Sequence, residues 1–323
     1  MRAVVHDSFG SADVLEIRDI EKPTPADDEV LVRVCAASVN PADWYGVTGR
    51  PWVARPTMGF FKPKETRVGV DFAGTVEAVG KDVTQFRPGD DVFGGRTGAF
   101  AEYVCVREER AVVPKPANVT FEQAAAVPVA ALTALQGLRD KGRLQPGQKV
   151  LVNGASGGVG TFAVQIAKAL GAEVTGVCST RNVDIARSLG ADDVIDYTRE
   201  DFTRSDRRYD LLLDIAGSRS WSEYKRVLNP HATLVVVGAP KGNRLLGPLS
   251  HIVKVRLAAL RGSRKVVFFI AKFNKEDMLV LRDLLESGKV TPVIDRRYTL
   301  SEVADALRYT GEGHSQGKNV ITV

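Results

Sequence analysis

Two hydrophobic patterns divide most of this chain. Up to about residue 125, apolar and polar residues alternate over short stretches, as at Val30, Val32 and Val34. A period of two is typical of strands that are buried on one face. The pattern therefore predicts a twisted β domain with strands that include 29–34, 71–80 and 100–106.

From about residue 126, continuous apolar runs alternate with helical periodicity. Tyr209–Ile215 is almost entirely apolar, as expected for a strand buried on both faces of a parallel sheet. The helix predicted over 159–170 has one apolar face and would end at Gly171. These segments predict the α/β class with a doubly wound parallel sheet, in which strands at 150–152, 173–178, 193–197, 209–215 and 233–238 alternate with helices at 159–170, 182–189 and 220–228.

The last part of the chain carries an apolar run at Val266–Ala271, two predicted helices over 276–287 and 301–309, and a final strand at 317–323. We expect this tail to return to the first domain, with the parallel-sheet domain inserted and a cleft between the two. The predicted domains are therefore 1–125, 126–262 and the returning segment 263–323.

A glycine-rich turn joins the strand at 150–152 to the following helix. It reads Asn153-Gly154-Ala155-Ser156-Gly157-Gly158-Val159-Gly160. Glycines let the backbone approach a pyrophosphate, and the N–H groups and positive dipole end of the helix bind the anion. The context on both sides supports a dinucleotide site, held by Ser156, Gly157, Gly158, Val159 and Gly160.

The residues about twenty positions further on predict which dinucleotide binds. An Asp or Glu at the tip of the second strand would hold both ribose hydroxyls of NAD. Here the sequence is Cys178-Ser179-Thr180-Arg181, with no carboxylate at the tip. Ser179 can donate to a 2′-phosphate and Arg181 can pair with it, which favours NADPH. The alternative is that Arg181 is a solvated side chain at a helix start.

Composition limits the remaining classes. The chain has 323 residues, 44% hydrophobic and 26% charged, which is ordinary for a globular protein. No apolar run approaches the roughly 18 residues of a membrane span, and four acidic residues among the first twenty do not suit a targeting peptide. Three scattered cysteines fit a reducing compartment, so we expect a cytoplasmic enzyme without an integral membrane segment.

The net charge of +5 is unevenly distributed, because 241–265 contains seven Lys and Arg residues and no acidic residue. We favour a solvated helix face with arginines near the cofactor phosphates. The alternative is contact with an anionic membrane or an acidic partner. No aromatic interleaving or nucleic-acid motif accompanies the charge, so no nucleic-acid partner is expected.

The chain resembles the medium-chain dehydrogenase/reductase superfamily, and within it the zinc-free quinone oxidoreductase branch. The markers are Val70-Asp71-Phe72-Ala73-Gly74-Thr75-Val76, Pro88-Gly89-Asp90-Asp91-Val92-Phe93-Gly94, the glycine-rich turn, Leu189-Gly190-Ala191-Asp192 and Gly317-Lys318-Asn319-Val320. Segment 241–265 is similar to the subgroup of reticulon-interacting and chloroplast quinone oxidoreductase homologues. The resemblance implies a GroES-like catalytic domain with an inserted Rossmann domain.

The departures from the zinc enzymes predict chemistry without a metal. Asn40 stands where the zinc alcohol dehydrogenases have a cysteine ligand, and Val70 stands where they have histidine. An apolar side chain cannot bind zinc, and an amide is a poor ligand beside a thiolate. The histidines, His6, His231, His251 and His314, are isolated in the sequence. We therefore expect no metal site.

The resemblance also implies cofactor contacts beyond the glycine turn. Thr133 is similar to the residue beside the nicotinamide ribose, and Tyr197 to a tyrosine near the 2′-phosphate. The other implied contacts lie at strand ends, at the nicotinamide side of the cleft and near the C-terminus: Ala216, Gly217, Val237, Gly238, Ala239, Phe268, Phe269, Lys318 and Asn319. For Phe268 and Phe269, a place in the apolar core is the alternative.

Without a metal, reduction of a quinone or of the β-carbon of an enone is favoured, because the charge is delocalised and a hydrogen bond suffices. We expect an enzyme that transfers hydride from NADPH to quinones or α,β-unsaturated carbonyls. Asn40 and Tyr45 are the predicted catalytic residues, as an amide donor and an acidic hydroxyl. Trp44 offers a flat face to a ring substrate, and Phe269 would contact the substrate from the nicotinamide side of the cleft. Asp43 is expected to be structural or to contact the cofactor side, and not to act as a general acid.

An apolar loop adds a second substrate prediction. Trp52, Phe60 and Phe61 lie in the Pro- and Gly-rich segment 51–63, and such a loop should either pack or cover something. We expect it to line the entrance for apolar substrates. The alternative is a satellite core beneath a long loop.

The sequence leaves two alternative functions and a possible homodimer open. The chain could be an alcohol dehydrogenase or ketone reductase with a side-chain proton donor. It could also be a non-catalytic NADPH sensor that uses 241–265 to bind a membrane or partner. Pairing of the edge segment Val266–Ala271 would give a homodimer.

Overall fold

The computed structural model describes residues 1–217, 219–238, 245–247, 249–259, 262–313 and 315–323. The chain forms two compact units. Unit 1 consists of Met1–Leu132 and Lys272–Val323, and unit 2 is the continuous segment Thr133–Ala271. The boundaries between the two units therefore lie at 132/133 and 271/272, whereas the sequence predicted boundaries at 125/126 and 262/263.

Unit 1 is built on a seven-stranded, mainly antiparallel sheet in the order β14-β15-β3-β4-β5-β7, with β6 paired to β3. Its strands are β3 (Glu29–Val39), β4 (Asp71–Val79), β5 (Asp91–Gly95), β6 (Tyr103–Arg107), β7 (Val112–Pro114), β14 (Ile294–Thr299) and β15 (Lys318–Thr322). A separate hairpin pairs β1 (Arg2–Val5) with β2 (Glu16–Asp19). The C-terminal strand β15 pairs directly with β3, so the tail does return to the first β domain.

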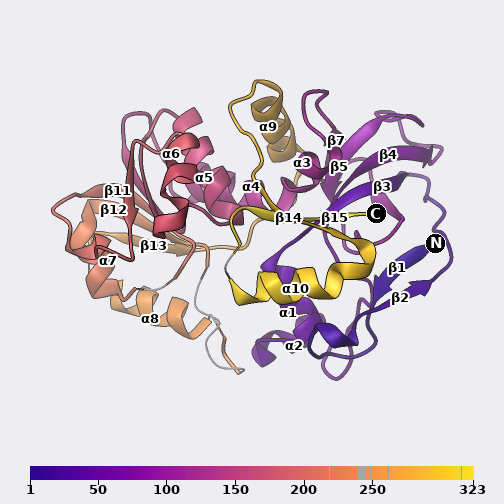
Figure 1. Cartoon of the computed structure of the whole chain (residues 1–323), viewed down its shortest axis with the longest axis horizontal. Helices are drawn as coiled ribbons and strands as arrows, with labels where there is room; N and C mark the ends of the chain where they lie inside the picture. The colour runs from indigo at the N-terminus through magenta and orange to yellow at the C-terminus, as the bar shows by residue number, and fades with distance from the viewer. Residues whose placement is uncertain (218, 239–244, 248, 260–261, 314) are drawn as a thin grey trace. The chain divides into compact units, whose positions relative to one another are not determined.

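Five α-helices of unit 1 matter for the site or the core: α1 (Pro41–Thr48), α2 (Arg55–Met58), α3 (Phe121–Ala125), α9 (Lys275–Glu286) and α10 (Val303–Glu312). Figure 1 shows α10 beside α1. Both helices cover an apolar cluster that includes Val47, Leu307 and Ile321. Trp44 packs against this cluster from α1.

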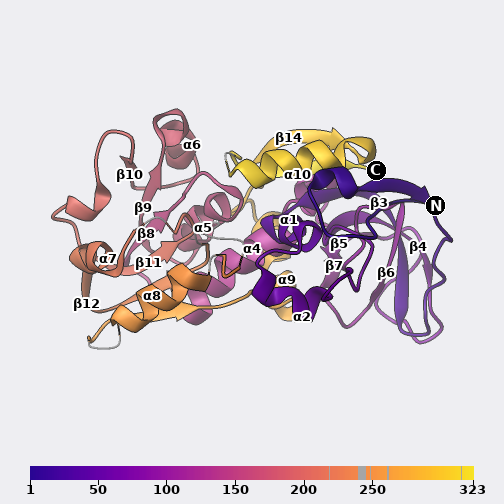
Figure 2. The same ribbon diagram turned by 90° about the horizontal axis from the view of Figure 1, so that it is seen from below.

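Unit 2 is a six-stranded parallel sheet in the order β10-β9-β8-β11-β12-β13. The strands are β8 (Lys149–Asn153), β9 (Glu173–Cys178), β10 (Asp193–Asp196), β11 (Tyr209–Asp214), β12 (Leu228–Val236) and β13 (Lys265–Phe268). The main helices are α4 (Pro128–Leu135), which crosses from unit 1, α5 (Gly158–Ala169), α6 (Val183–Ser188), α7 (Trp221–Val227) and α8 (Leu249–Ala259). Figure 2 shows α6 and α8 on opposite sides of the sheet, which confirms the doubly wound arrangement.

The strand order has a functional consequence. The chain runs from β8 outward through β9 to β10, and then returns to place β11 on the other side of β8. Ligands of doubly wound sheets bind at the carboxyl ends of the strands where the order reverses. In this sheet that point lies between β8 and β11, directly at the glycine-rich turn.

Local differences from the predicted elements have identifiable causes. β12 begins at Leu228 rather than Thr233, with an irregular register beside Tyr209–Leu211. The helix start predicted at Ser301 is moved back, because Thr299 and Glu302 form a capping box around the short helix η6 (Leu300–Glu302). Gly171 has φ +81° and ends α5 as predicted.

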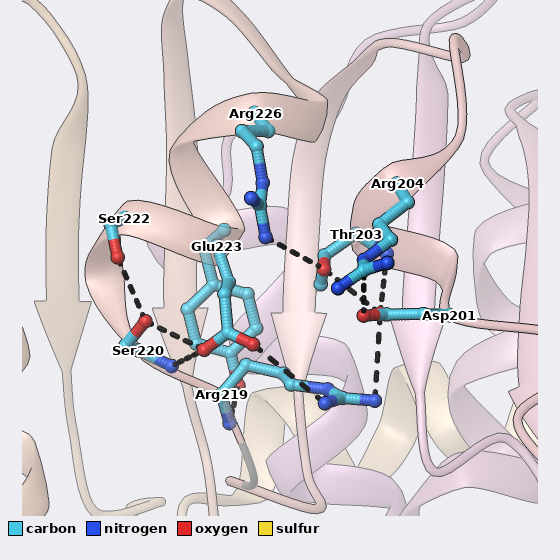
Figure 3. A network of polar contacts seen from close by, with 9 residues as sticks. Asp201, Thr203, Arg204, Arg219, Ser220, Ser222, Glu223 and Arg226 are labelled. Atoms are coloured by element: carbon cyan, nitrogen blue, oxygen red, sulfur yellow. Dashed lines mark hydrogen bonds and ion pairs between the residues drawn. The ribbon is translucent and has the colours of Figure 1, made fainter.

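A polar network fixes the start of α7 in unit 2 (Figure 3). Arg219 reaches Asp201 at 3.5 Å and Glu223 at 3.7 Å. Glu223 also accepts a hydrogen bond of 2.8 Å from the Ser220 backbone N–H, which satisfies a donor at the helix N-terminus. The network thereby joins α7 to the neighbouring short helix η5 (Phe202–Arg204).

Candidate functional site

The glycine-rich turn is as tight as the sequence predicts. Gly154 has φ +96°, a conformation that side chains disfavour. A Cβ on Gly160 would lie 2.0 Å from the carbonyl oxygen of Gly154, so this position admits only glycine. The first turn of α5 carries no acidic side chain. Its N–H groups and dipole therefore form a cradle for an anion.

Polar side chains from two strand ends meet beside this turn. Asn182 Nδ2 donates to Ser156 Oγ at 2.8 Å and to Ser179 Oγ at 3.2 Å. Asn182 occupies the N-cap position of α6, but its side chain makes these bonds and no capping hydrogen bond to the helix. Its Oδ1 is buried without a hydrogen-bond partner in the described part of the chain. A buried acceptor that lacks a donor fits a site completed by a hydroxyl-bearing ligand such as a nucleotide ribose.

A carboxylate that the sequence analysis did not consider lies beside the tip of β9. Asp196 at the end of β10 is the register partner of Cys178. It accepts a hydrogen bond of 2.6 Å from Thr180 Oγ1 and one of 2.7 Å from Thr198 Oγ1. Arg199 lies 3.4 Å away. The hydrogen bond from Thr180 is the main cause that holds the pKa of Asp196 below its ordinary value.

The surroundings of Asp196 affect how the ribose that carries a 2′-hydroxyl or 2′-phosphate could be recognised at the end of β9. The end of β9 itself carries no acidic residue, as the sequence indicates, but the neighbouring strand β10 places Asp196 beside it. The carboxylate is already engaged by two hydroxyl groups and an arginine. Ser179 and Arg181 directly follow the end of β9, and Tyr197 is 55% exposed next to Asp196.

A second buried carboxylate lies under the turn at the switch point. Asp214, at the end of β11, accepts hydrogen bonds from Asn153 Nδ2 at 2.7 Å and from the Gly217 N–H at 3.0 Å. Tyr224 on α7 donates its hydroxyl to the same carboxylate at 2.5 Å. Burial raises the pKa of Asp214 and that of Tyr224. The network joins the end of β8, the loop after β11 and α7, and the sequence analysis did not find it.

The other predicted cofactor residues of unit 2 lie as follows. Gly217 is buried and Ala216 exposed after β11, whereas Val237 and Gly238 are half-buried after β12. A Cβ on Gly238 would lie 1.9 Å from the Ile215 carbonyl, so these two strand ends approach closely. Thr133 is half-buried on α4. Ala239 lies outside the described residues.

The two predicted aromatic residues have different surroundings. Phe268 packs against the apolar core under β12 and β13, as its alternative interpretation expects. Phe269 is half-buried, and the Lys141 ammonium lies 5.9 Å from the centre of its ring. Their contact with a nicotinamide stays a prediction.

Unit 1 contains a buried charged cluster built from segments far apart in sequence. Lys318 Nζ donates to Asn40 Oδ1 at 2.5 Å and lies 3.5 Å from Asp71 Oδ2. Asp71 Oδ2 also accepts from Asn40 Nδ2 at 2.9 Å and from Ser38 Oγ at 3.0 Å. Asp43 completes the cluster by accepting the Asn40 backbone N–H at 2.7 Å.

Burial dominates the titration of this cluster. It raises the pKa of Asp43 to about 7, with a smaller contribution from the neighbouring Asp71. It also raises the pKa of Asp71 and lowers that of Lys318. Ionised groups are unfavourable in a low-dielectric interior unless they are paired, so the cluster retains the proton of Asp43 up to near-neutral pH.

Most predicted catalytic and C-terminal residues point into unit 1. Asn40 is 2% exposed, and both ends of its amide are engaged by Lys318 and Asp71. Asn319 is buried and donates to Thr310 Oγ1 and Ser315 Oγ, both at 3.0 Å. These side chains bind other residues of unit 1. The donor role of Asn40 and the cofactor contacts of Lys318 and Asn319 stay predictions.

Trp44 and Tyr45 are adjacent on α1 and their rings meet edge to face, with centroids 5.2 Å apart. Trp44 packs on the core, and its indole is close enough to Gly311 that a Cβ there would clash at 2.7 Å. Tyr45 is half-buried, and burial raises the pKa of its hydroxyl. Neither residue lines the pocket of unit 1 that lies beside α1, and their contact with a substrate stays a prediction.

A pocket of about 240 Å³ opens beside the charged cluster in unit 1. Its walls come from α1, from the N-terminal segment and from the loop before β4, and they include Asp43, Gly46, Met58, Val70 and Phe9. Val70 presents a methyl surface at the position where a zinc enzyme would have a ligand. Within the described residues, no three His, Cys, Asp or Glu side chains come together as a metal site.

The predicted aromatic entrance is arranged differently. Trp52, Phe60 and Phe61 are exposed and do not line this pocket. Thr57, Met58 and Pro63 of the same segment, and Lys64 directly after it, form part of the wall instead. The interpretation of Phe60 and Phe61 as a satellite core is wrong, because both rings face outward.

Comparisons with known proteins agree with this architecture. A family described as alcohol dehydrogenase GroES-like domain matches residues 26–117, and one described as zinc-binding dehydrogenase matches residues 189–321. The chain is similar to chloroplastic quinone-oxidoreductase QR1 of Triphysaria versicolor, at 33% identity over 99% of this chain and 98% of that protein. The predicted combination of a GroES-like and a Rossmann-like domain is confirmed.

Two further similarities bear on activity and fold. The chain is 32% identical to the chloroplastic NADPH-dependent alkenal/one oxidoreductase of Arabidopsis thaliana, over 99% of this chain and 79% of that protein. The solved quinone oxidoreductase of Coxiella burnetii superposes with a TM-score of 0.87 at 30% identity, and covers 100% of this chain and 99% of that one. No helix in the described ranges is long and apolar enough to cross a membrane.

Proposed function

This chain belongs to the medium-chain dehydrogenase/reductase superfamily, alongside its quinone oxidoreductases, and we propose that it reduces quinones or α,β-unsaturated carbonyls with NADPH. The observation that carries the proposal is the glycine-rich turn at the switch point of the unit 2 sheet. Gly154, Gly160 and the unpartnered Asn182 oxygen fit a dinucleotide. The named quinone and alkenal/one oxidoreductases among its relatives supply the acceptor class.

The preference for NADPH rests on the end of β9. Ser179 and Arg181 can bind a 2′-phosphate, whereas Asp196 is held by Thr180, Thr198 and Arg199 and is not offered to a ribose. The variant R181A should weaken NADPH binding by more than about tenfold and NADH binding by less than about twofold. R187A, an exposed arginine on the following helix, is the matched control. Equal losses for both dinucleotides would contradict the assignment.

The acceptor is proposed to bind in unit 1, beside α1. The bound nicotinamide supplies a hydride, and the protein must then orient the acceptor and support its developing charge. In a quinone or an enone this charge spreads over several atoms, so a hydrogen bond can replace a metal. Tyr45 is the proposed donor, and Asn40 holds the start of α1 through Asp43 and Lys318.

Turnover with a panel of acceptors tests the proposal. NADPH oxidation is measured with quinones, 2-alkenals and cyclic enones, with and without a strong chelator. We expect turnover that the chelator leaves unchanged, and a larger loss for Y45F with enones than with quinones. Loss of activity in chelator would contradict the metal-independent chemistry, and tight NADPH binding without turnover would favour the non-catalytic sensor.

A further inference from the structure

The segment 50–64, here called the aromatic loop, leaves its large apolar side chains in solvent. Phe61 is 85% exposed, Phe60 62% and Trp52 50%. With Val53, they make up four of the twelve exposed large apolar side chains in the described residues, within fifteen positions of the sequence. Single exposed apolar residues are ordinary, but a concentration of this kind indicates an interaction surface.

The backbone of the aromatic loop holds the two phenylalanines at the tip of a closed turn. The Lys64 N–H donates to the Met58 carbonyl at 2.8 Å, and the Gly59 N–H donates to the Arg55 carbonyl at 2.8 Å. Gly59 has φ +119°, and a Cβ there would lie 1.9 Å from the Lys62 carbonyl. Phe60 and Phe61 meet edge to face at 5.0 Å. The rings are therefore presented by a built turn (near α2 in Figure 1).

The charge of the aromatic loop selects the kind of surface that it fits. It carries Arg50, Arg55, Lys62 and Lys64, and no acidic residue occurs from position 44 to 64. Arg55 lies 5.8 Å from the Trp52 ring and Lys64 donates to the Pro56 carbonyl at 3.0 Å. Two of the four cations thus brace the turn, and Lys62 is exposed directly beside Phe61.

Exposed aromatic rings on a loop that carries four basic residues match the interface of a bilayer. Trp and Phe partition into the boundary between headgroups and acyl chains, and Lys and Arg bind anionic headgroups. We propose that the aromatic loop is a membrane-docking element, which inserts Trp52, Phe60 and Phe61 into a bilayer that contains anionic lipid. This peripheral mode needs no spanning helix, because apolar insertion and basic charge act as two combined signals.

The proposal differs from the alternative in which the basic segment 241–265 contacts a membrane. The described part of that segment also exposes Val253 and Leu257 on α8, beside Lys254 and Arg256. It carries no exposed aromatic ring, and aromatic rings are the side chains that settle at a bilayer interface. The chain therefore carries two surfaces that can be compared, each with four exposed large apolar residues in the described part of the chain, and one pair can be changed in each.

Flotation of the full chain with lipid vesicles tests the proposal. Vesicles of phosphatidylcholine alone are compared with vesicles that contain 30% phosphatidylglycerol, at low and high salt. We expect binding to the anionic vesicles that salt weakens. F60S/F61S should lose at least tenfold in vesicle affinity, K62E should lose about fivefold or more, and the control V253S/L257S should bind as the parent does. Unchanged thermal unfolding of each variant shows that the fold is kept.

Tryptophan emission provides a second measurement, because the chain has only Trp44, Trp52 and Trp221. A blue shift on addition of anionic vesicles that W52F abolishes would support insertion of the aromatic loop. No binding to either vesicle, or binding that V253S/L257S removes and F60S/F61S keeps, would overturn the proposal. A concentration-dependent dimer that F60S/F61S dissociates would also overturn it, since a second copy would then cover the rings.

Discussion

One buried carboxyl group should make the stability of this protein depend on pH. Asp43 is 6% exposed, and burial raises its pKa from an ordinary 3.8 to about 7. Between these pH values the folded chain holds a proton that the unfolded chain has released. The stabilisation from this group is complete below pH 3.8 and is lost as the pH rises toward 7.

The variant D43N isolates this effect. An asparagine oxygen can still accept the Asn40 N–H, now at 2.7 Å from the carboxylate, but an amide does not ionise. A tenfold change in an acid dissociation constant corresponds to about 1.4 kcal/mol. From pH 5 to pH 8, the free energy of unfolding of D43N should therefore rise relative to the parent by about 3 kcal/mol.

Urea unfolding of both proteins at pH 5 and pH 8 measures this difference. Trp44 and Trp52 belong to unit 1 and Trp221 to unit 2, so a W221F background restricts the fluorescence signal to unit 1. D82N changes an exposed aspartate and serves as the control. An equal difference between D43N and the parent at both pH values, or a parent that gains relative stability as pH rises, would refute the reasoning.

Three further predictions concern other parts of the site. In K318M, Asp71 loses its buried cation, and the free energy of unfolding should fall by about 3–5 kcal/mol; urea unfolding should show partial recovery when D71N is added. In Y224F, Asp214 loses the 2.5 Å hydroxyl bond, and calorimetry should show a loss of about 1–3 kcal/mol. G160A should raise the Kd for NADPH at least about tenfold, because its Cβ would meet a carbonyl at 2.0 Å. G157A, whose Cβ would lie 3.7 Å from the same oxygen, should change that Kd less in the same fluorescence titration.

The parallel-sheet unit was predictable because its signals are local. β9 spans Glu173–Cys178 as predicted, since a short apolar run lies between Gly171 and a polar turn. α1 was missed, because its apolar residues do not form one face and it begins at a proline. The spacing of Asn40, Pro41 and Asp43 was the available signal, because an amide cap, a proline at the first position and an acid three residues on favour a helix start.

In the candidate site too, the parts formed by residues close in sequence could be predicted, and the parts formed by distant residues could not. The glycine-rich turn could be located from sequence, because Gly154 and Gly160 act on backbone atoms a few residues away. The charged cluster could not, because Lys318 and Asn40 are 278 positions apart and only the pairing of β15 with β3 brings them together. Asp196 reaches Thr180 across neighbouring strands, and no spacing rule along the chain predicts that contact.

The most direct test of the central claim is to follow the hydride itself. NADPH deuterated at the reactive C4 position is supplied with a cyclic enone, and mass spectrometry locates the label in the product. We predict deuterium on the β-carbon of a saturated ketone, with the same result in the presence of a chelator. Deuterium on the hydroxyl-bearing carbon of an allylic alcohol would show a ketone reductase and would contradict the proposed function.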